Sequence, residues 1–141
     1  MFDTLEGRTV LVLGAGKMSE LTAKHLNANG VHNTIVANRT FERAEELAKK
    51  FNGRAIPFED RYNYMREADI IVSATSAKEY VITRDELAPY ATHRPDPLFL
   101  IDIAVPRDID PALRSIAGVY LYDIDDLQGV IDANYLERQR A

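Results

Sequence analysis

Strand-like apolar runs alternate with helix-like stretches along the 141 residues of this chain, and this alternation limits the folds that it can adopt. The run Thr9–Leu13 has no polar alternation, which is typical of a strand buried on both faces of a parallel sheet. Further strands are predicted over Thr34–Ala37, Arg54–Ile56, Asp69–Ala74, Leu98–Val105 and Val119–Tyr122. Strands joined in this way form right-handed βαβ units. The prediction is an α/β fold: a doubly wound, mainly parallel six-stranded sheet with helices on both faces.

The predicted helices are recognised by apolar spacing and by the residues that begin and end them. One helix extends from about Lys17 to Asn29, and Gly30 is placed to end it in the left-handed region. A second follows Thr40 as its N-cap, with apolar residues at steps of three and four up to Phe51. Gly53 is predicted to end this second helix.

Further segments carry weaker helix signals. Thr83-Arg-Asp-Glu86 is a capping box, in which the Thr hydroxyl and the Glu carboxylate are each expected to bind a free backbone N–H. The helix that it begins should stop near Ala91. The stretch Asp60–Glu67 predicts only a turn or two of helix, and Asp108–Pro111 is interpreted as a turn into a helix. The tail from about Asp126 to Arg140 is also predicted to be helical.

Composition and charge exclude several classes of function. The net charge of −5 argues against a nucleic-acid or anionic-membrane surface spread over the whole chain. No apolar run approaches the roughly 20 residues that a membrane span needs, and no signal-peptide pattern begins the chain. Because cysteine is absent, the chain has no disulfide frame, thiolate zinc site or cysteine nucleophile. We expect a soluble, cytoplasmic single domain over residues 1–141.

A glycine turn, Gly14-Ala-Gly16-Lys-Met-Ser19, lies between the first predicted strand and the first predicted helix. In the G-x-G-x-x-small pattern the first Gly allows the tight turn, the second lets a pyrophosphate approach, and the third position stays small for close packing. The pyrophosphate would bind the free N–H groups at the helix N-terminus. A ligand-free turn and the glycine turn of a methyltransferase that uses S-adenosylmethionine are the alternatives. The predicted cofactor contacts are Gly14, Ala15, Gly16, Lys17 and Met18.

The type of cofactor depends on Asn38-Arg39-Thr40, about 24 residues after Gly14. Enzymes that use NAD place a carboxylate on the ribose near this offset, and no carboxylate occurs here. An Arg suits a 2′-phosphate because its planar guanidinium offers paired donors. Thr40 can add a hydroxyl, and Arg43 lies one turn further along. We therefore predict NADP(H), bound by Asn38, Arg39, Thr40 and Arg43, although a solvated helix start beside Glu42, Glu45 and Glu46 is the alternative.

Two loops at the carboxyl ends of predicted strands are expected to line the ribose and nicotinamide side of the cofactor. They are Ser73–Ser76 and Ile103–Pro106, and ordinary loop capping is the alternative for each. The residues predicted to contact the cofactor are Ala74, Thr75, Ser76, Ile103, Ala104 and Val105.

No catalytic residue and no metal site are predicted. The three histidines, His25, His32 and His93, lack metal-ligand spacing. The tyrosines form no Tyr-x-x-x-Lys pair, and no Ser–His–Asp order stands out. Asp125 or Asp126 is interpreted as an N-cap. The sequence therefore predicts a cofactor site without chemistry of its own.

Several segments together carry a family resemblance. They are Leu13–Glu20, Ala37–Thr40, Arg43–Ala48, Asp69–Thr75, Leu100–Pro111 and Leu121–Leu127. Over nearly the whole chain they closely resemble the NADPH-binding domain of glutamyl-tRNA reductase. The Ile-Asp-Ile-Ala-Val-Pro-Arg-Asp-Ile-Asp-Pro and Tyr-Asp-Ile-Asp-Asp-Leu runs are far more specific than the glycine turn. Asn-Arg-Thr also occurs in shikimate dehydrogenase, whose cofactor domain is a relative.

The resemblance implies an enzyme of three domains. A cysteine of the N-terminal catalytic domain takes the glutamyl group from glutamyl-tRNA as a thioester. NADPH on the middle domain reduces it to glutamate-1-semialdehyde, the first committed step of tetrapyrrole (porphyrin) biosynthesis. A long helix leads to a C-terminal dimerisation domain. Expected partners are the other two domains, glutamyl-tRNA through the catalytic domain, and the downstream glutamate-1-semialdehyde aminomutase.

This chain resembles only the middle domain, and Gly129–Ala141 resembles the start of the long helix. We therefore expect an excised domain or a truncated gene product that is inactive alone. Two other interpretations remain open: a shikimate- or quinate-dehydrogenase-like cofactor domain, and a non-enzymatic module that binds NADPH. The dehydrogenases should lack the long Ile-Asp-Ile-Ala-Val-Pro run.

Overall fold

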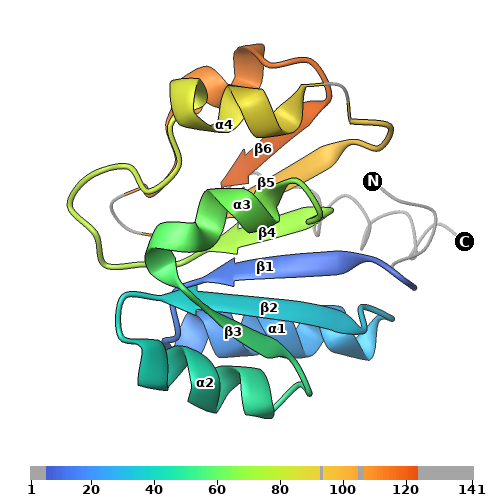
Figure 1. Ribbon diagram of the computed structural model, residues 1–141, viewed down its shortest axis with the longest axis vertical. Helices are drawn as coiled ribbons and strands as arrows, with labels where there is room; N and C mark the ends of the chain where they lie inside the picture. The colour runs from blue at the N-terminus through green and yellow to red at the C-terminus, as the bar shows by residue number, and fades with distance from the viewer. Residues whose placement is uncertain (1–5, 93, 105–106, 124–141) are drawn as a thin grey trace, which may run out of the picture.

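Six parallel strands form one sheet, in the spatial order β3-β2-β1-β4-β5-β6, in a computed structural model that describes residues 6–92, 94–104 and 107–123 (Figure 1). The strands are β1 (Thr9–Leu13), β2 (Asn33–Asn38), β3 (Arg54–Pro57), β4 (Ile70–Ser73), β5 (Leu98–Asp102) and β6 (Val119–Asp123). All five strand pairings are parallel. The strand order reverses between β1 and β4, so this is the topological switch point of a Rossmann-like sheet. The predicted fold class is confirmed.

Short helices connect these strands. They are α1 (Lys17–Ala28), α2 (Phe41–Lys49), the 3-10 turn η1 (Phe58–Asp60), α3 (Arg61–Met65), α4 (Arg84–Ala91) and the 3-10 turn η2 (Pro111–Ser115). In the described part of the chain, no helix has the length and apolar character needed to cross a membrane.

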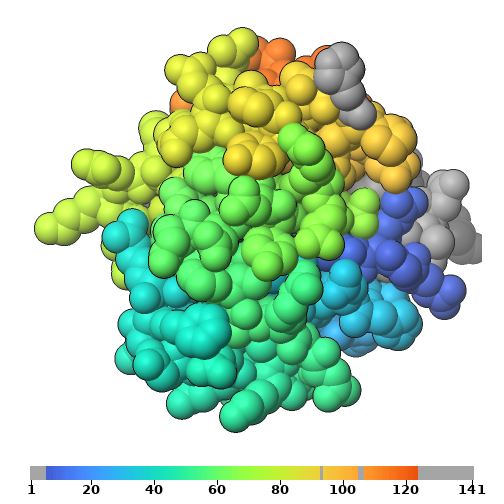
Figure 2. Space-filling model, in the orientation of Figure 1, coloured from blue at the N-terminus to red at the C-terminus, as the bar shows by residue number. Residues whose placement is uncertain are grey.

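Two hydrophobic cores lie on opposite faces of the sheet because successive strand residues point to opposite sides. Val10 and Val12 of β1 pack with α1 and α2 on one face. Leu11 and Leu13 of the same strand pack with α3 and α4 on the other. Figure 2 shows residues of α3 and α4, coloured green to yellow, covering the second face. Burial on both sides explains why the first strand shows no polar alternation in the sequence.

The helix ends agree with the sequence prediction at Gly30 and differ at Gly53. Gly30 follows the end of α1 with a φ of +115°, as predicted. After α2, however, the left-handed residue is Asn52, with a φ of +52°. Gly53 is needed for a different reason: a Cβ there would lie 2.4 Å from the carbonyl oxygen of Thr34 in β2. Gly53 therefore permits close packing of the chain against β2.

The capping box at α4 forms with only one of its two expected backbone bonds. Thr83 Oγ1 accepts a hydrogen bond from the Glu86 N–H at 3.4 Å. The Glu86 carboxylate accepts from the Thr83 hydroxyl at 2.8 Å instead of from its N–H. That N–H donates to the Tyr62 hydroxyl at 3.2 Å, so α3 takes the place of the carboxylate.

Three smaller points complete the comparison with the predicted elements. Strand β5 ends at Asp102, before the predicted Val105. Thr40 is the N-cap of α2 by position, but its side chain makes no capping hydrogen bond. Val105, Pro106 and the tail from 124 onward, with the predicted N-caps Asp125 and Asp126, lie outside the described residues.

Replacing Gly53 with Ala should destabilise the protein by about 1–3 kcal/mol, because the added Cβ meets backbone that cannot rotate away. Gly16→Ser is the matched control: Gly16 is the N-cap of α1, and a Cβ there meets nothing within 4 Å. Urea unfolding of both variants measures the difference. Equal unfolding midpoints for the two variants would show that the β2 contact does not restrict position 53.

Candidate functional site

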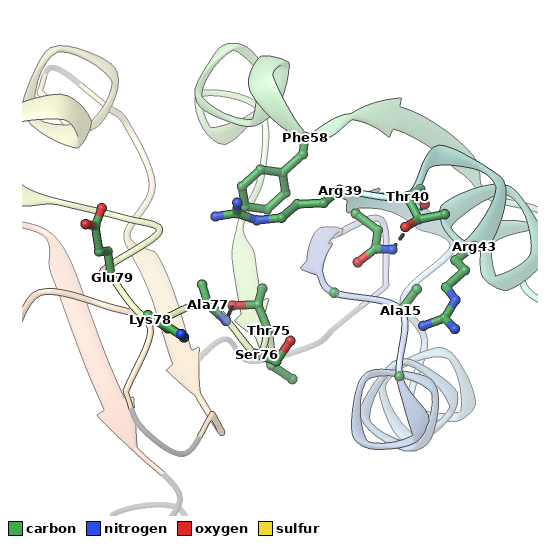
Figure 3. A pocket seen from close by; sticks show the side chains of 14 residues that line it. Ala15, Arg39, Thr40, Arg43, Phe58, Thr75, Ser76, Ala77, Lys78 and Glu79 are labelled. Atoms are coloured by element: carbon green, nitrogen blue, oxygen red, sulfur yellow. Dashed lines mark hydrogen bonds between the residues drawn. The ribbon is translucent and has the colours of Figure 1, made fainter.

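A cavity of about 700 Å³ opens at the carboxyl ends of β1, β2 and β4 (Figure 3). Its lining residues come from the turn after β1, the segment that joins β2 to α2, the end of β3 and the loop after β4: Gly14, Ala15, Gly16, Asn38, Arg39, Thr40, Arg43, Phe58, Ala74, Thr75, Ser76, Ala77, Lys78 and Glu79. Ligands of open α/β sheets bind at this kind of position, beside the switch point. The cavity is therefore the candidate site.

Most of the residues predicted from the sequence line this one cavity. They are Gly14, Ala15, Gly16, Asn38, Arg39, Thr40, Arg43, Ala74, Thr75 and Ser76. Lys17 and Met18 lie in the first turn of α1 outside the lining. Ile103 and Ala104 are buried after β5 and also lie outside it, and Val105 is not among the described residues. The structure thus brings together the three predicted segments before β5, and leaves Ile103 and Ala104 outside the cavity.

The sequence prediction missed Phe58, Ala77, Lys78 and Glu79. Ala77, Lys78 and Glu79 continue the loop after β4, so a longer loop would have included them. Phe58 follows Pro57 at the carboxyl end of β3. That position beside a strand end was the available signal for Phe58.

The two glycines of the turn have different structural roles. Gly14 has a φ of +102°, and a Cβ there would lie 2.8 Å from the Ala74 carbonyl oxygen. The fold itself therefore requires Gly14. Gly16 has a φ of −82°, and a Cβ there would meet nothing within 4 Å. No contact within the described protein explains Gly16, and its Cα borders the cavity.

Ser19 fills the small third position of the glycine pattern. Its side chain is fully buried, and its Oγ lies 3.3 Å from the site of a Cβ on Gly14. Among the described residues this Oγ has no hydrogen-bond partner. A larger side chain would push α1 away from the turn, so the packing role predicted for this position agrees with the structure.

The N-terminus of α1 presents free backbone donors beside this turn. The first intrahelical hydrogen bond joins the Glu20 N–H to the Gly16 carbonyl oxygen at 3.1 Å. The N–H groups before Glu20 have no acceptor within the helix, and Gly16 offers no side-chain cap. The helix dipole adds a partial positive charge at this end. This part of the cavity is suited to an anion.

Two guanidinium groups line the cavity, one from the segment after β2 and one from the start of α2. Arg39 extends beside the Phe58 ring, with its Cζ 5.1 Å from the ring centroid, and Arg43 lies on the side of Ala15 (Figure 3). Asn38 Nδ2 donates to the Thr40 carbonyl oxygen at 3.1 Å, and this bond holds the turn that carries Arg39. Within residues 6–92, 94–104 and 107–123, no carboxylate pairs with either Arg39 or Arg43. The neighbouring glutamates of α2 therefore leave both positive charges available.

A buried pair of carboxylates supports the loops at the carboxyl ends of β4 and β5. The sequence interpretation gave Asp108–Pro111 as a turn into a helix, which agrees with the start of η2 at Pro111, and it assigned no contact to the Asp108 side chain. Asp110 caps η2 by accepting from the Ala112 N–H at 3.0 Å. Asp108 is fully buried and accepts from Ser73 Oγ at 2.8 Å and from the Thr75 N–H at 2.7 Å.

Asp102, the last residue of β5, is the second carboxylate of this pair. Its oxygens accept from the backbone N–H groups of Ala104 at 3.1 Å and of Asp108 and Ile109 at 2.9 Å. Burial raises the pKa of Asp102 above its ordinary value, and the three N–H groups partly offset this effect. Asp102 therefore holds the chain after β5 in place through backbone contacts.

The sequence matches the family described as Shikimate / quinate 5-dehydrogenase over residues 1–130. The glutamyl-tRNA reductase of Desulforudis audaxviator is 54% identical over 139 residues, which cover 98% of this chain and 31% of that protein. This chain thus spans about a third of the length of the curated relatives that it matches.

Two solved structures share the architecture. The glutamyl-tRNA reductase from Methanopyrus kandleri has a TM-score of 0.86 and 41% identity, covering 97% of this chain and 34% of that one. The nucleotide binding domain of the glutamyl-tRNA reductase from Thermoplasma volcanium has a TM-score of 0.68 and 19% identity, covering 97% and 89%. The second likeness shows the fold.

The raised pKa of Asp102 predicts how stability depends on pH. Because the folded protein holds this proton more tightly than the unfolded chain, its contribution to the free energy of unfolding is largest below the ordinary Asp pKa of about 3.9 and is lost as pH rises through the folded pKa. Asp102→Asn lacks this titration. The free energy of unfolding of the unmodified protein minus that of the variant should therefore decrease from about pH 4 to pH 7.

Denaturant unfolding at several pH values measures this difference, and equal m-values show that the same transition is compared. A difference that increases with pH would contradict the direction assigned to the Asp102 pKa.

Proposed function

The chain belongs to the family described as Shikimate / quinate 5-dehydrogenase, and we propose that within this family it is the NADPH-binding domain of a glutamyl-tRNA reductase. The observation that carries the proposal is that two kinds of anion-binding group line one cavity. They are the free N–H groups at the start of α1 beside the open Gly16, and the guanidinium groups of Arg39 and Arg43. A dinucleotide with a 2′-phosphate has anionic groups for both.

The residues of the cavity fit such a cofactor group by group. The pyrophosphate would bind the N-terminal N–H groups of α1, approaching over Gly16. The 2′-phosphate would bind the guanidinium groups of Arg39 and Arg43 and the hydroxyl of Thr40, and the flat Arg39–Phe58 pair would support the adenine. The nicotinamide half would lie along the loop after β4. When bound, the nicotinamide supplies a hydride.

The reaction itself needs groups that this chain does not contain. Formation of a glutamyl thioester requires a thiolate, and the 141 residues include no cysteine. The thioester would be presented by a catalytic domain, and glutamyl-tRNA would be bound through that domain. Without it nothing holds the acyl carbon beside the nicotinamide, so the chain alone is inactive.

We also propose that the chain is the middle domain of a three-domain enzyme. Residues 1–141 would belong to one NADP(H)-binding domain, and the predicted helix from about 126 lies outside the described residues. The product, glutamate-1-semialdehyde, passes to the aminomutase of porphyrin biosynthesis in the cytoplasm. The whole-chain identity to reductases supports this proposal.

A second candidate is a shikimate- or quinate-dehydrogenase cofactor domain, which the family match over residues 1–130 favours. It accounts less well for 54% identity to a glutamyl-tRNA reductase over 139 residues. A cysteine-bearing domain encoded in frame upstream would separate the two candidates in favour of the reductase.

Arg39→Asp should weaken NADPH binding by roughly ten- to a hundredfold and weaken NADH binding less, because only NADPH carries the 2′-phosphate. The variant loses a charge-assisted phosphate contact of about 1.5–3 kcal/mol. Titration calorimetry with both cofactors measures the change. Lys24→Asp, an equal change of charge on α1 outside the cavity lining, is the matched control. Equal affinity of the unmodified chain for NADPH and NADH would contradict the assignment of the 2′-phosphate site.

Gly16→Val should abolish dinucleotide binding and leave the protein folded. The branched side chain occupies the space over which the pyrophosphate approaches, and it meets no other described part of the protein within 4 Å of its Cβ. Far-UV circular dichroism checks the fold, and fluorescence titration with NADPH checks binding. NADPH binding that survives with an unchanged spectrum would show that the phosphates bind elsewhere.

A further inference from the structure

The loop between β4 and α4 forms one wall of the cavity through Ala74–Glu79 and projects at the left edge of Figure 1. Ser76, Lys78, Glu79 and Tyr80 are exposed, and residues 76–80 form no helix or strand. Such a segment has few contacts of its own to fix its shape. Its conformation must therefore be set where it is attached, at Thr75 and at Val81.

Both attachments lead to Asp108. At the first, the Asp108 carboxylate accepts from the Thr75 N–H at 2.7 Å and from Thr75 Oγ1 at 2.6 Å. Thr75 Oγ1 in turn accepts from the Ala77 N–H at 3.2 Å, so the contact extends into the loop. At the second, the Asp108 carbonyl oxygen accepts from the Val81 N–H at 2.7 Å.

The second attachment continues as a short parallel bridge. Ile82 pairs with Ile109, and the Asp110 N–H donates to the Ile82 carbonyl oxygen at 3.0 Å. Asp108 is itself held to β5, because its N–H donates to Asp102 Oδ2 at 2.9 Å. A chain of contacts therefore runs from β5 through Asp102 and Asp108 to both ends of the loop.

We propose that Asp108 is the positioning residue for the β4–α4 loop, and that it fixes the wall of the cavity against which the nicotinamide half of the dinucleotide lies. This inference rests on the proposed function, since it assumes that a dinucleotide binds in the cavity. It assigns to Asp108 no contact with the cofactor. The residue acts through Thr75 and Val81.

The chemistry of the site favours this role over simple packing. Asp108 is fully buried, and a buried carboxylate is unfavourable unless donors surround it. A carboxylate has only acceptors, and Ser73 Oγ, the Thr75 N–H and Thr75 Oγ1 supply three donors. An apolar side chain would fill the same space without that requirement. The carboxylate is therefore explained by the donors that it orients, two of which belong to Thr75.

The test compares two ligands that share the adenosine half. Adenosine 2′,5′-bisphosphate carries the 2′-phosphate but lacks the nicotinamide half. Asp108→Ala should weaken NADPH binding by roughly tenfold or more, as expected for lost positioning contacts, while binding of the bisphosphate changes by less than about twofold. Asp110→Ala is the matched control, because Asp110 caps η2 two residues further along. It should leave both affinities within about twofold.

Thr75 provides a second test that keeps the carboxylate. Thr75→Val removes the hydroxyl that bonds Asp108, and Thr75→Ser restores it. The Val variant should lose NADPH affinity selectively, and the Ser variant should recover it. If Asp108→Ala does not fold, this pair of variants decides the question.

Equal weakening of both ligands in folded Asp108→Ala, or in Thr75→Val, would overturn the positioning role and leave a structural one. Unchanged NADPH affinity in both variants would overturn it as well. Failure of the unmodified chain to bind either ligand would instead contradict the proposed function, and with it this inference.

Discussion

The close approach of the turn after β1 to the end of β4 is the constraint on which the site depends. The Gly14 N–H donates to the Ala37 carbonyl oxygen of β2 at 2.9 Å, and the Ala74 N–H donates to the Leu13 carbonyl oxygen at 3.0 Å. A Cβ on Gly14 would lie 2.8 Å from the Ala74 carbonyl oxygen. The carboxyl ends of β1, β2 and β4 therefore come together around Gly14, which has no side chain. Beyond Gly14 the segments that follow these strands diverge, and the cavity lies between them.

The residues near the turn after β1 have two different roles: some pack within the protein, and others face the cavity. Gly14 and Ser19 have a packing role, because their small size lets α1 pack closely on the sheet. Gly16 faces open space, and within the described residues Arg39 and Arg43 have no carboxylate partner, although Arg39 lies beside the Phe58 ring. An open glycine and two cations without carboxylate partners that line one cavity are typical of an anion-binding site.

Sequence reasoning recovered the features that depend on neighbouring residues. Unbroken apolar runs such as Thr9–Leu13 predicted strands buried on both faces, and each of them lies in the sheet. The glycine turn and Asn38-Arg39-Thr40 follow adjacent strands, so a parallel sheet brings them together at one edge. In the same way, the left-handed Gly30 was predictable from the end of one helical pattern.

Features that depend on distant residues were not recovered. Asp108 is separated from Thr75 by 33 residues and from Ser73 by 35, and a single sequence does not reveal that pairing. The Thr83 N–H is bound by the hydroxyl of Tyr62, 21 residues earlier, where local capping rules expected Glu86. Gly53 was predicted to end the second helix, but its lack of a side chain is required by the Thr34 carbonyl oxygen in β2, which a Cβ on Gly53 would contact. Tertiary packing decided each of these contacts.

The most direct test of this account is a crystal structure of the chain bound to NADPH. The account predicts the pyrophosphate within hydrogen-bond distance of the N–H groups that begin α1, and the 2′-phosphate between the guanidinium groups of Arg39 and Arg43. It also predicts the nicotinamide half beside Thr75. A dinucleotide bound in this cavity with its 2′-phosphate in solvent, or bound at another part of the surface, would contradict it.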